Sequence, residues 1–144
     1  MSVSFTVIGT PAPQGSKTRW GTEDNPNTRP WRAAVAASAS EAHTFRGGGG
    51  TSGYLEPLLD PVKVRADFYF PRPKHHYRTG RYAGLLKESA PLYCATTPDL
   101  DKLQRAIGDA LKGVILHDDS QIVGWDATKF YGQPARAEIT VMAA

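Results

Sequence analysis

Two pairs of aspartates lie close together in the sequence, and carboxylates in such an arrangement can bind a metal ion. Asp99 and Asp101 are separated by one residue, and Asp118 and Asp119 are adjacent. Carboxylates brought together repel one another and raise one another's pKa, so a cluster of them usually needs a cation. Hard oxygen ligands suit Mg²⁺, which keeps several waters and joins a few carboxylates to substrate phosphates. The two pairs therefore predict phosphodiester chemistry with Mg²⁺, for which Mn²⁺ is the expected substitute.

An aspartate near the start of a helix also has an ordinary structural role. Its carboxylate can cap free amides and interact favourably with the helix dipole, so capping is the alternative for Asp99 or Asp101 taken singly. For Asp109 we expect a surface ion pair with Lys112. An EF-hand is excluded, because the positions after Asp101 lack the third oxygen ligand and the turn glycine of that loop.

The elements that must position the aspartates are a helix and the chain that follows it. Apolar residues recur at three and four positions between Leu100 and Leu111, after Pro98 and before Gly113, which predicts a helix. Such a helix is roughly 20 Å long. The apolar run 114–116 can then lead the chain back toward the start of the helix, which allows the two pairs to approach each other.

The remaining hydrophobic patterns predict one more helix and four strands, and the short apolar run 114–116 is a candidate fifth strand. The strands are expected at residues 3–8, 62–70, 122–130 and 135–142. The last two should form a hairpin across 132–134, and the helix should run from Trp31 to about Phe45. We therefore expect a single α+β domain over residues 1–144, with a small mixed or antiparallel sheet and two main helices.

Two stretches without periodicity, about 46–61 and 71–97, are expected to be flexible loops. A long stretch of this kind in a small domain usually indicates either function or disorder. The second stretch contains the cations Arg72, Lys74, Arg78, Arg81 and Lys87, with Tyr77 and Tyr82 between them. These side chains predict contacts with DNA phosphates and stacking on bases, and a solvated charged loop is the alternative.

Charge is divided unevenly along the chain. The formal net charge is +3, but residues 1–98 hold 12 basic and 7 acidic residues, whereas residues 99–144 hold 5 and 7. This division predicts a first part that binds phosphates and a second part that holds the metal. The loop at 9–19 is not a P-loop, because its glycine spacing is wrong and its two prolines remove amide donors, so no nucleotide cofactor is expected.

Several protein classes and sites are disfavoured by what the sequence lacks. There is no run of about 18 apolar residues to span a membrane and no secretion signal. The single cysteine, Cys94, cannot pair within the chain, so we expect a soluble protein of a reducing cytoplasm. The spacing of His75, His76 and Cys94 does not fit a zinc site, and both histidines are expected to be solvated or to face DNA.

Three motifs together resemble one known family. D-x-D-x-L at 99–103, D-A-L at 109–111 and D-D-x-Q-I at 118–122 resemble the RusA family of Holliday junction resolvases, which is common in phages and prophages. The loop at 9–19 and Lys129 are also similar to that family. The resemblance implies a homodimeric, Mg²⁺-dependent endonuclease that acts in recombination and repair inside a bacterial host cell. It would bind four-way DNA junctions and nick two opposing strands symmetrically.

The resemblance also assigns roles to individual residues. Asp99, Asp101 and Asp119 would bind the metal, with Asp118 beside them. The family motif commonly reads D-x-D-N-L-x-K, whereas here Lys102 replaces the asparagine and Arg105 stands at the position of the catalytic lysine. Arginine keeps the charge and can contact a phosphate in bidentate fashion, but it donates a proton less readily than lysine.

Further DNA contacts are expected from Lys17 and Arg19 in the first loop and from Lys129. Because a four-way junction is two-fold symmetric, a two-fold dimer would place identical sites on opposing strands. Two other functions stay open at this point. One is a non-catalytic DNA-binding protein in which the aspartates are helix caps, and the other is a nuclease of the same fold that cuts other branched DNA.

Overall fold

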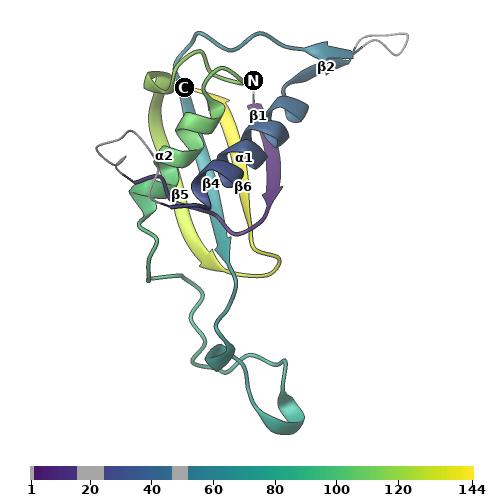
Figure 1. The fold of residues 1–144 in the computed structure, drawn as a ribbon, viewed down its shortest axis with the longest axis vertical. Coiled ribbons are helices and arrows are strands. Elements are labelled where there is room, and N and C mark those ends of the chain that lie inside the picture. Colours follow the sequence, from purple (N-terminus) through teal and green to yellow (C-terminus); the bar gives the residue numbers. More distant parts are fainter. Residues whose placement is uncertain (1, 16–24, 47–51) are drawn as a thin grey trace.

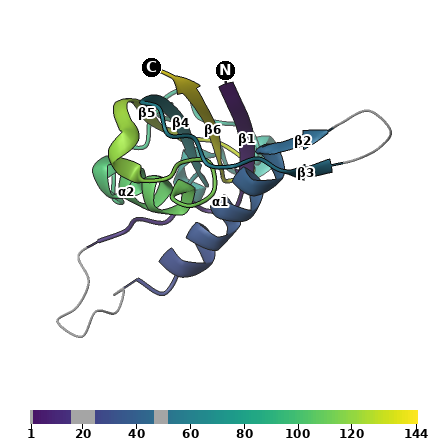
Figure 2. The ribbon, with the colours of Figure 1, turned by 90° about the horizontal axis from the view of Figure 1, so that it is seen from above.

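The computed structural model describes residues 2–15, 25–46 and 52–144, and its centre is a mixed four-stranded sheet in the order β1-β6-β4-β5. The strands are β1 (Ser2–Ile8), β4 (Val62–Phe70), β5 (Ile122–Tyr131) and β6 (Arg136–Ala143). Helices α1 (Thr28–Ala42) and α2 (Leu100–Leu111) both cover one face of this sheet (Figure 1 and Figure 2). The structure confirms the predicted α+β class, with a mixed sheet and two main helices.

The hydrophobic core lies between the two helices and the sheet. Strand β4 turns every second side chain toward the helices, from Val62 to Phe70, and these side chains are buried. Helix α2 buries Leu103, Ile107 and Leu111, which lie on one face because their spacing is close to one helical turn. This packing fixes α2 against the sheet, and the opposite side of α2 is left at the surface.

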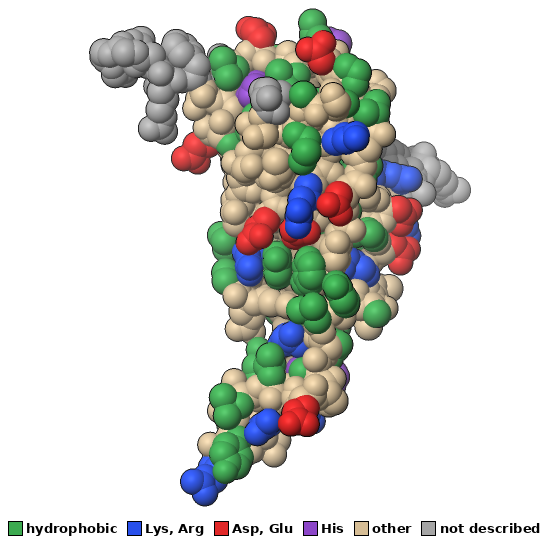
Figure 3. All heavy atoms as spheres, turned by 180° about the vertical axis from the view of Figure 1, so that it is seen from behind, with side chains coloured by type: hydrophobic (Ala, Val, Ile, Leu, Met, Phe, Trp, Pro, Cys, Tyr) green, Lys and Arg blue, Asp and Glu red, His purple; other side chains and the backbone are tan. Residues whose placement is uncertain are grey.

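The other face of the sheet is not covered by either helix and carries charged side chains of both signs. Arg65 lies 3.5 Å from Asp67, and Arg136 lies 3.0 Å from Glu138. Figure 3 shows Lys or Arg and Asp or Glu side chains next to one another on this face. Because the charges neutralise one another, this face offers little net attraction for a polyanion.

The predicted hairpin of the last two strands is wrong. Strand β4 lies between them, parallel to β5 and antiparallel to β6. The connection at 132–135 passes the end of β4, where the N–H of Gly132 donates to the carbonyl of Phe70 at 3.0 Å. Two strand spacings amount to roughly 10 Å, which four residues can span. The turn residues therefore predict that the chain reverses, but not which strand lies beside it.

Three further elements differ from the predictions. Helix α1 begins at Thr28 and ends at Ala42, and a short antiparallel pair, β2 (Thr44–Arg46) and β3 (Ser52–Tyr54), interrupts the expected loop at about 46–61. The apolar run 114–116 does not extend the sheet. Ile115 and Leu116 are buried in the turn after α2, where the backbone of Leu58 bonds on both sides of Leu116.

Residues 71–97 form an arm that extends from the end of β4, away from the sheet (Figure 1). The arm contains two short 3-10 helices, η2 (Lys74–His76) and η3 (Gly80–Tyr82). It folds back on itself, since the N–H of Lys87 donates to the carbonyl of His76 at 3.0 Å. Its returning part then bonds to the edge of β5, where the N–H of Cys94 donates to the carbonyl of Lys129 at 3.0 Å.

No helix in the described ranges is both long and apolar enough to cross a membrane.

Candidate functional site

Asp101 and Asp119 line one small surface pocket of about 240 Å³, which we name the aspartate pocket. Asp101 lies in the first turn of α2, and Asp119 begins the 3-10 helix η4 (Asp119–Gln121). The other residues of the pocket are Gln104, Arg105, Gly108, Ile122 and Trp125. Residues 101, 104, 105 and 108 share one face of α2 because they are three or four residues apart. The two aspartate pairs therefore come together as predicted, but only through one member of each pair, Asp101 and Asp119.

Helix α2 and η4 lie close together at Gly108. A Cβ atom at position 108 would lie 3.6 Å from the Cβ of Asp119 and 3.7 Å from the Cδ1 of Ile122, which is ordinary van der Waals contact. An alanine therefore fits at this position, but any longer side chain would occupy the space between α2 and Asp119.

The carboxylate of Asp118 is held by its neighbours. It accepts a hydrogen bond from the backbone N–H of Ser120 at 3.2 Å and another from the Ser120 hydroxyl, and it lies 3.1 Å from the Nζ of Lys112. The Asp118 N–H donates to the Gln121 side chain at 2.7 Å, which completes a capping box. Hydrogen bonds from Ser120 and Lys112 lower the pKa of Asp118 to about 2. Asp118 thus fixes the turn that presents Asp119.

Asp99 occupies the N-cap position of α2, but its side chain makes no capping hydrogen bond. Its carboxylate lies 3.6 Å from the Nζ of Lys102, one turn along the helix. Neither Asp101 nor Asp119 forms an ion pair with another described residue. The four predicted carboxylates are therefore in two different situations: Asp101 and Asp119 line the pocket, whereas Asp99 and Asp118 are each paired with a lysine.

Lys129 fastens the chain that leads into α2. Its Nζ donates to the carbonyl oxygens of Thr96 at 2.6 Å and Pro98 at 2.8 Å. Because an ammonium group has three hydrogens, most of its donor capacity is used by these two backbone groups. The arrangement positions the residue directly before Asp99.

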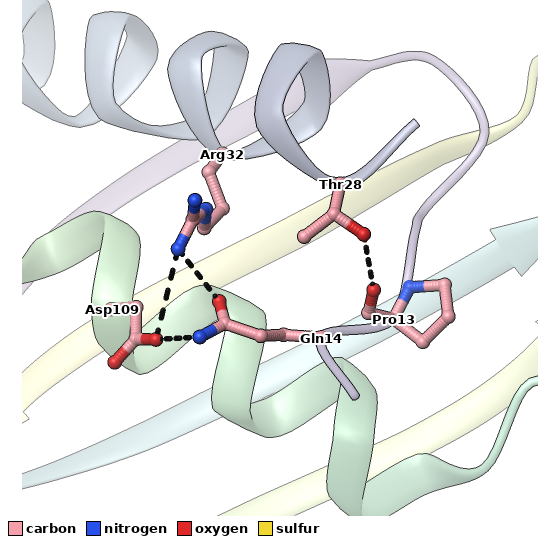
Figure 4. A network of polar contacts seen from close by, with 5 residues as sticks. All are labelled: Pro13, Gln14, Thr28, Arg32 and Asp109. Atoms are coloured by element: carbon pink, nitrogen blue, oxygen red, sulfur yellow. Dashed lines mark hydrogen bonds and ion pairs between the residues drawn. The ribbon is translucent and has the colours of Figure 1, made fainter. Parts of the chain in front are cut away.

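A part-buried polar network joins the loop after β1 to both helices (Figure 4). The side-chain amide of Gln14 donates to Asp109 and accepts from Arg32 at 3.0 Å, and its backbone N–H donates to the carbonyl of Lys102 at 3.0 Å. Gln14 is only 6% exposed. The network holds the end of this loop against the first turn of α2, beside Asp101.

This network also shows that the predicted pair of Asp109 with Lys112 is wrong. Asp109 faces α1, where Arg32 lies 3.9 Å away, and Lys112 pairs with Asp118. Sequence reasoning missed Gln14 because its partner Asp109 is 95 residues away, and no local pattern marks such a pair.

The predicted DNA-binding cations are distributed over several regions. Lys17 and Arg19 lie outside the described residues. Arg72 is at the base of the arm, where it donates to the carbonyl of Pro91 at 2.7 Å and lies over the ring of Tyr131. The other four predicted cations of the arm, Lys74, Arg78, Arg81 and Lys87, have exposed side chains. Figure 3 shows positive side chains along the arm and at its far end.

The prediction that both histidines are solvated or face DNA is wrong for His76. Its ring is buried edge-on against Tyr131, with the ring centres 4.8 Å apart. Burial, together with the nearby positive charges of His75 and Arg72, lowers the pKa of His76. His76 is therefore part of the packing at the base of the arm.

The residues of the aspartate pocket fit a weakly held hard cation such as Mg²⁺. Within the described ranges, no group of three or more His, Cys, Asp or Glu residues could hold a metal ion without help. Mg²⁺ is commonly bound by one or two carboxylates, several waters and a substrate phosphate. Two carboxylates in an open pocket beside an arginine match that donor set, whereas zinc and calcium prefer more protein ligands.

Residues 5–142 match the family described as Endodeoxyribonuclease RusA. The chain belongs to the RusA family. It is also similar to the uncharacterized protein YqaN of Bacillus subtilis strain 168, with 28% identity over 146 residues that cover 96% of this chain and 94% of that protein. Membership confirms the resemblance noted in the sequence and supports endonuclease activity. The RusA-like motifs at 99–103 and 118–122 contain Asp101 and Asp119, the two carboxylates of the aspartate pocket.

Proposed function

We propose that this protein is a magnesium-dependent endonuclease that resolves four-way DNA junctions by nicking two opposing strands. One observation carries the proposal: in a chain of the RusA family, Asp101 and Asp119 line a single open pocket together with Arg105. These two carboxylates come from separate motifs, and the arginine places a permanent positive charge beside them. Such a combination suits binding and cleavage of a phosphodiester.

Asp101 and Asp119 would hold the metal ion, with Asp99 and Asp118 at its flanks. When bound, Mg²⁺, or Mn²⁺ in its place, polarises the scissile phosphate and lowers the pKa of an attacking water. Asp118 orients Asp119 through the capping box of η4. Asp99 adds negative charge from the N-cap of α2, where Lys102 partly neutralises it.

Arg105 would bind the non-bridging oxygens of the scissile phosphate. It lies four residues after Asp101 and lines the same pocket, so both side chains reach one substrate group. Its guanidinium stays protonated, so it stabilises developing charge and does not supply the proton for the leaving oxygen. Solvent water is therefore the proton donor in this scheme.

The arm would bind the DNA that leads to the cleavage point. Lys74, Arg78, Arg81 and Lys87 are exposed along it and can contact successive phosphates. Tyr82, whose side chain is 51% exposed, can stack on an unpaired base. A homodimer would present two arms and two pockets with the two-fold symmetry of the junction.

The test is cleavage of end-labelled four-way, three-way and linear duplex DNA in Mg²⁺, Mn²⁺ or EDTA. We expect paired symmetric nicks in the four-way junction, none in EDTA, and no cleavage by Asp101→Asn although it still binds the junction. Asp126→Asn is the matched control, since Asp126 is exposed on β5 outside the pocket.

Three outcomes would contradict the proposal. Equal cleavage of linear duplex would exclude a junction resolvase. Normal cleavage by Asp101→Asn would exclude the assigned site. Binding without nicks and without any effect of Mg²⁺ would identify a non-catalytic DNA-binding protein.

A further inference from the structure

A groove larger than the aspartate pocket lies on another side of the first turn of α2. Its volume is about 940 Å³, and it is bounded by the loop at 9–13, the start of α1 and the segment 97–102. None of the residues that line it also lines the aspartate pocket. The roles proposed so far for the carboxylates, Arg105 and the arm leave this groove without a function.

The walls of the groove are mostly apolar. Trp31 and Phe70 contribute aromatic rings, and Pro11, Pro30 and Pro98 contribute rigid apolar surface. The indole N–H of Trp31 is buried without a hydrogen-bond partner in the described part of the chain. Walls of this kind suit a planar heterocycle better than a flexible aliphatic chain, because stacking needs flat surfaces.

Polar groups are also present among the lining residues. Asn25, Asn27 and Thr10 line the groove and carry amide and hydroxyl groups. Asparagine side chains can bond the edges of bases through paired donors and acceptors. An apolar surface with a few such groups can both hold a ligand and distinguish one ligand from another.

The groove and the aspartate pocket adjoin each other at the start of α2. Asp99 and Lys102 line the groove, and Asp101, two residues from Asp99, lines the aspartate pocket. Two residues correspond to at most about 7.6 Å between Cα atoms. A DNA strand whose phosphate lies at Asp101 can therefore reach the groove with a neighbouring nucleotide.

We propose that this groove receives an unpaired base of the strand being cut, next to the scissile phosphate, and thereby sets the sequence preference of cleavage. The proposal rests on the nuclease function proposed above. At the centre of a branched DNA, bases next to the branch lose a pairing or stacking partner, so inserting one costs less than in continuous duplex.

The chain offers a matched pair of variants. Ala34 is partly buried and lines the groove, whereas Ala33 is exposed on the same helix and does not. Leucine is a good helix former, so Ala34→Leu should fill the groove and Ala33→Leu should leave it open while adding the same side chain to α1.

The experiment combines these variants with junctions in which each nucleotide next to the scissile phosphate is replaced in turn by an abasic analogue. In wild type and Ala33→Leu, one abasic position should lower kcat/KM for junction cleavage about ten-fold or more, because the stacked base is missing. In Ala34→Leu, cleavage of the intact junction should already be reduced, and the same abasic position should change it less than about two-fold. Such coupling between a side chain and a base is expected when the two occupy the same cavity.

Circular dichroism and thermal unfolding will check that the variants are folded. If Ala34→Leu unfolds, Ala34→Gln, which also enters the groove, carries the same expectation. If wild type cuts the junction but all variants are equally sensitive to abasic sites, the groove proposal is overturned and the nuclease proposal stands. Failure of wild type to cut any branched DNA would instead remove the nuclease proposal, and the groove proposal with it.

Discussion

The aspartate pocket and the arm hold their charged side chains in different ways. In the aspartate pocket, the backbone that carries the reacting groups is fixed by hydrogen bonds: the capping box of Asp118 holds the turn of Asp119, and Lys129 and Gln14 bond to the backbone at the start of α2. The exposed cations of the arm are carried on turns that bond mainly through their own backbone. The pocket is thus suited to hold reacting groups in a defined geometry, and the arm to attract phosphates in variable positions.

This difference implies that variants of the two regions should affect different steps. A fixed site contributes through geometry and transition-state charge, so its variants should lower kcat. Exposed cations contribute through counterion release, so their variants should weaken binding and its dependence on salt. Variants of the two regions can therefore test whether the pocket and the arm act on different steps.

After Asp101→Asn, which should abolish cleavage, Arg105→Ala should have the largest effect on the rate of cleavage. Removing a charge that stabilises the transition state costs about 100- to 1,000-fold in kcat. Arg105→Lys should recover part of the rate, because the charge remains although the bidentate geometry does not. Single-turnover cleavage of a saturated four-way junction measures this effect, and equal rates for wild type and Arg105→Ala would remove Arg105 from the pocket chemistry.

Lys129→Met should have the next largest effect, because it releases the segment before Asp99. Misplacing a catalytic group by about 1 Å can cost up to roughly 100-fold in rate. We expect kcat to fall while junction affinity in EDTA stays close to that of wild type. Lys129→Arg should retain part of the rate, since a guanidinium can still donate to the two carbonyls of Thr96 and Pro98.

A different result at Lys129 would contradict its positioning role. If Lys129→Met weakened junction binding with little change in kcat, Lys129 would be a phosphate contact, as the sequence alone predicts. Measuring kcat and affinity separately therefore distinguishes the two roles.

The sequence predicted the elements whose neighbours are close along the chain. Helix α2 occupies the range that the sequence predicts, Leu100–Leu111, because its apolar spacing, Pro98 and Gly113 are all local signals. Simple alternation predicts strand β4 at 62–70 in the same way. The pairing of β4 between β5 and β6 could not be predicted, since it depends on contacts between segments far apart in sequence.

The same limit applies to the candidate site. The motif spacing brought Asp101 and Asp119 together, because both flank a single helix and its following turn. The contacts of Gln14 with Asp109 and of Lys129 with Thr96 and Pro98 join residues that are from 31 to 95 positions apart. The groove beside Asp99 is built from several such distant segments and has no signature in any one of them.

Removing two cations from the arm should have a smaller effect, confined to binding. Lys74→Gln with Lys87→Gln should lower junction affinity at moderate salt and reduce the slope of log affinity against log salt by roughly 0.9 for each phosphate that the arm no longer neutralises. The rate at saturating enzyme should not change. Lys63→Gln with Arg65→Gln is the matched control, because it removes two positive charges from the open face of the sheet. An equal change of slope in the control would mean that net charge, and not the arm, determines binding.

The smallest expected effect follows from removing the Asp118 carboxylate, and it is a change in acid stability. The pKa of Asp118 is lowered to about 2 in the folded chain, below its ordinary value near 4 in an unfolded chain. Between those values the unfolded state binds more protons, so the stability that Asp118 contributes is complete above pH 4 and disappears as the pH falls through about 2. Asp118→Asn should therefore be less stable than wild type at pH 6, and the difference should shrink toward pH 2.

Urea unfolding across this pH range measures the difference in stability, with Asp126→Asn as an exposed control. A difference that stayed constant with pH would show that the carboxylate charge does not stabilise η4, and the orientation of Asp119 would then have to depend on the amide of Gln121.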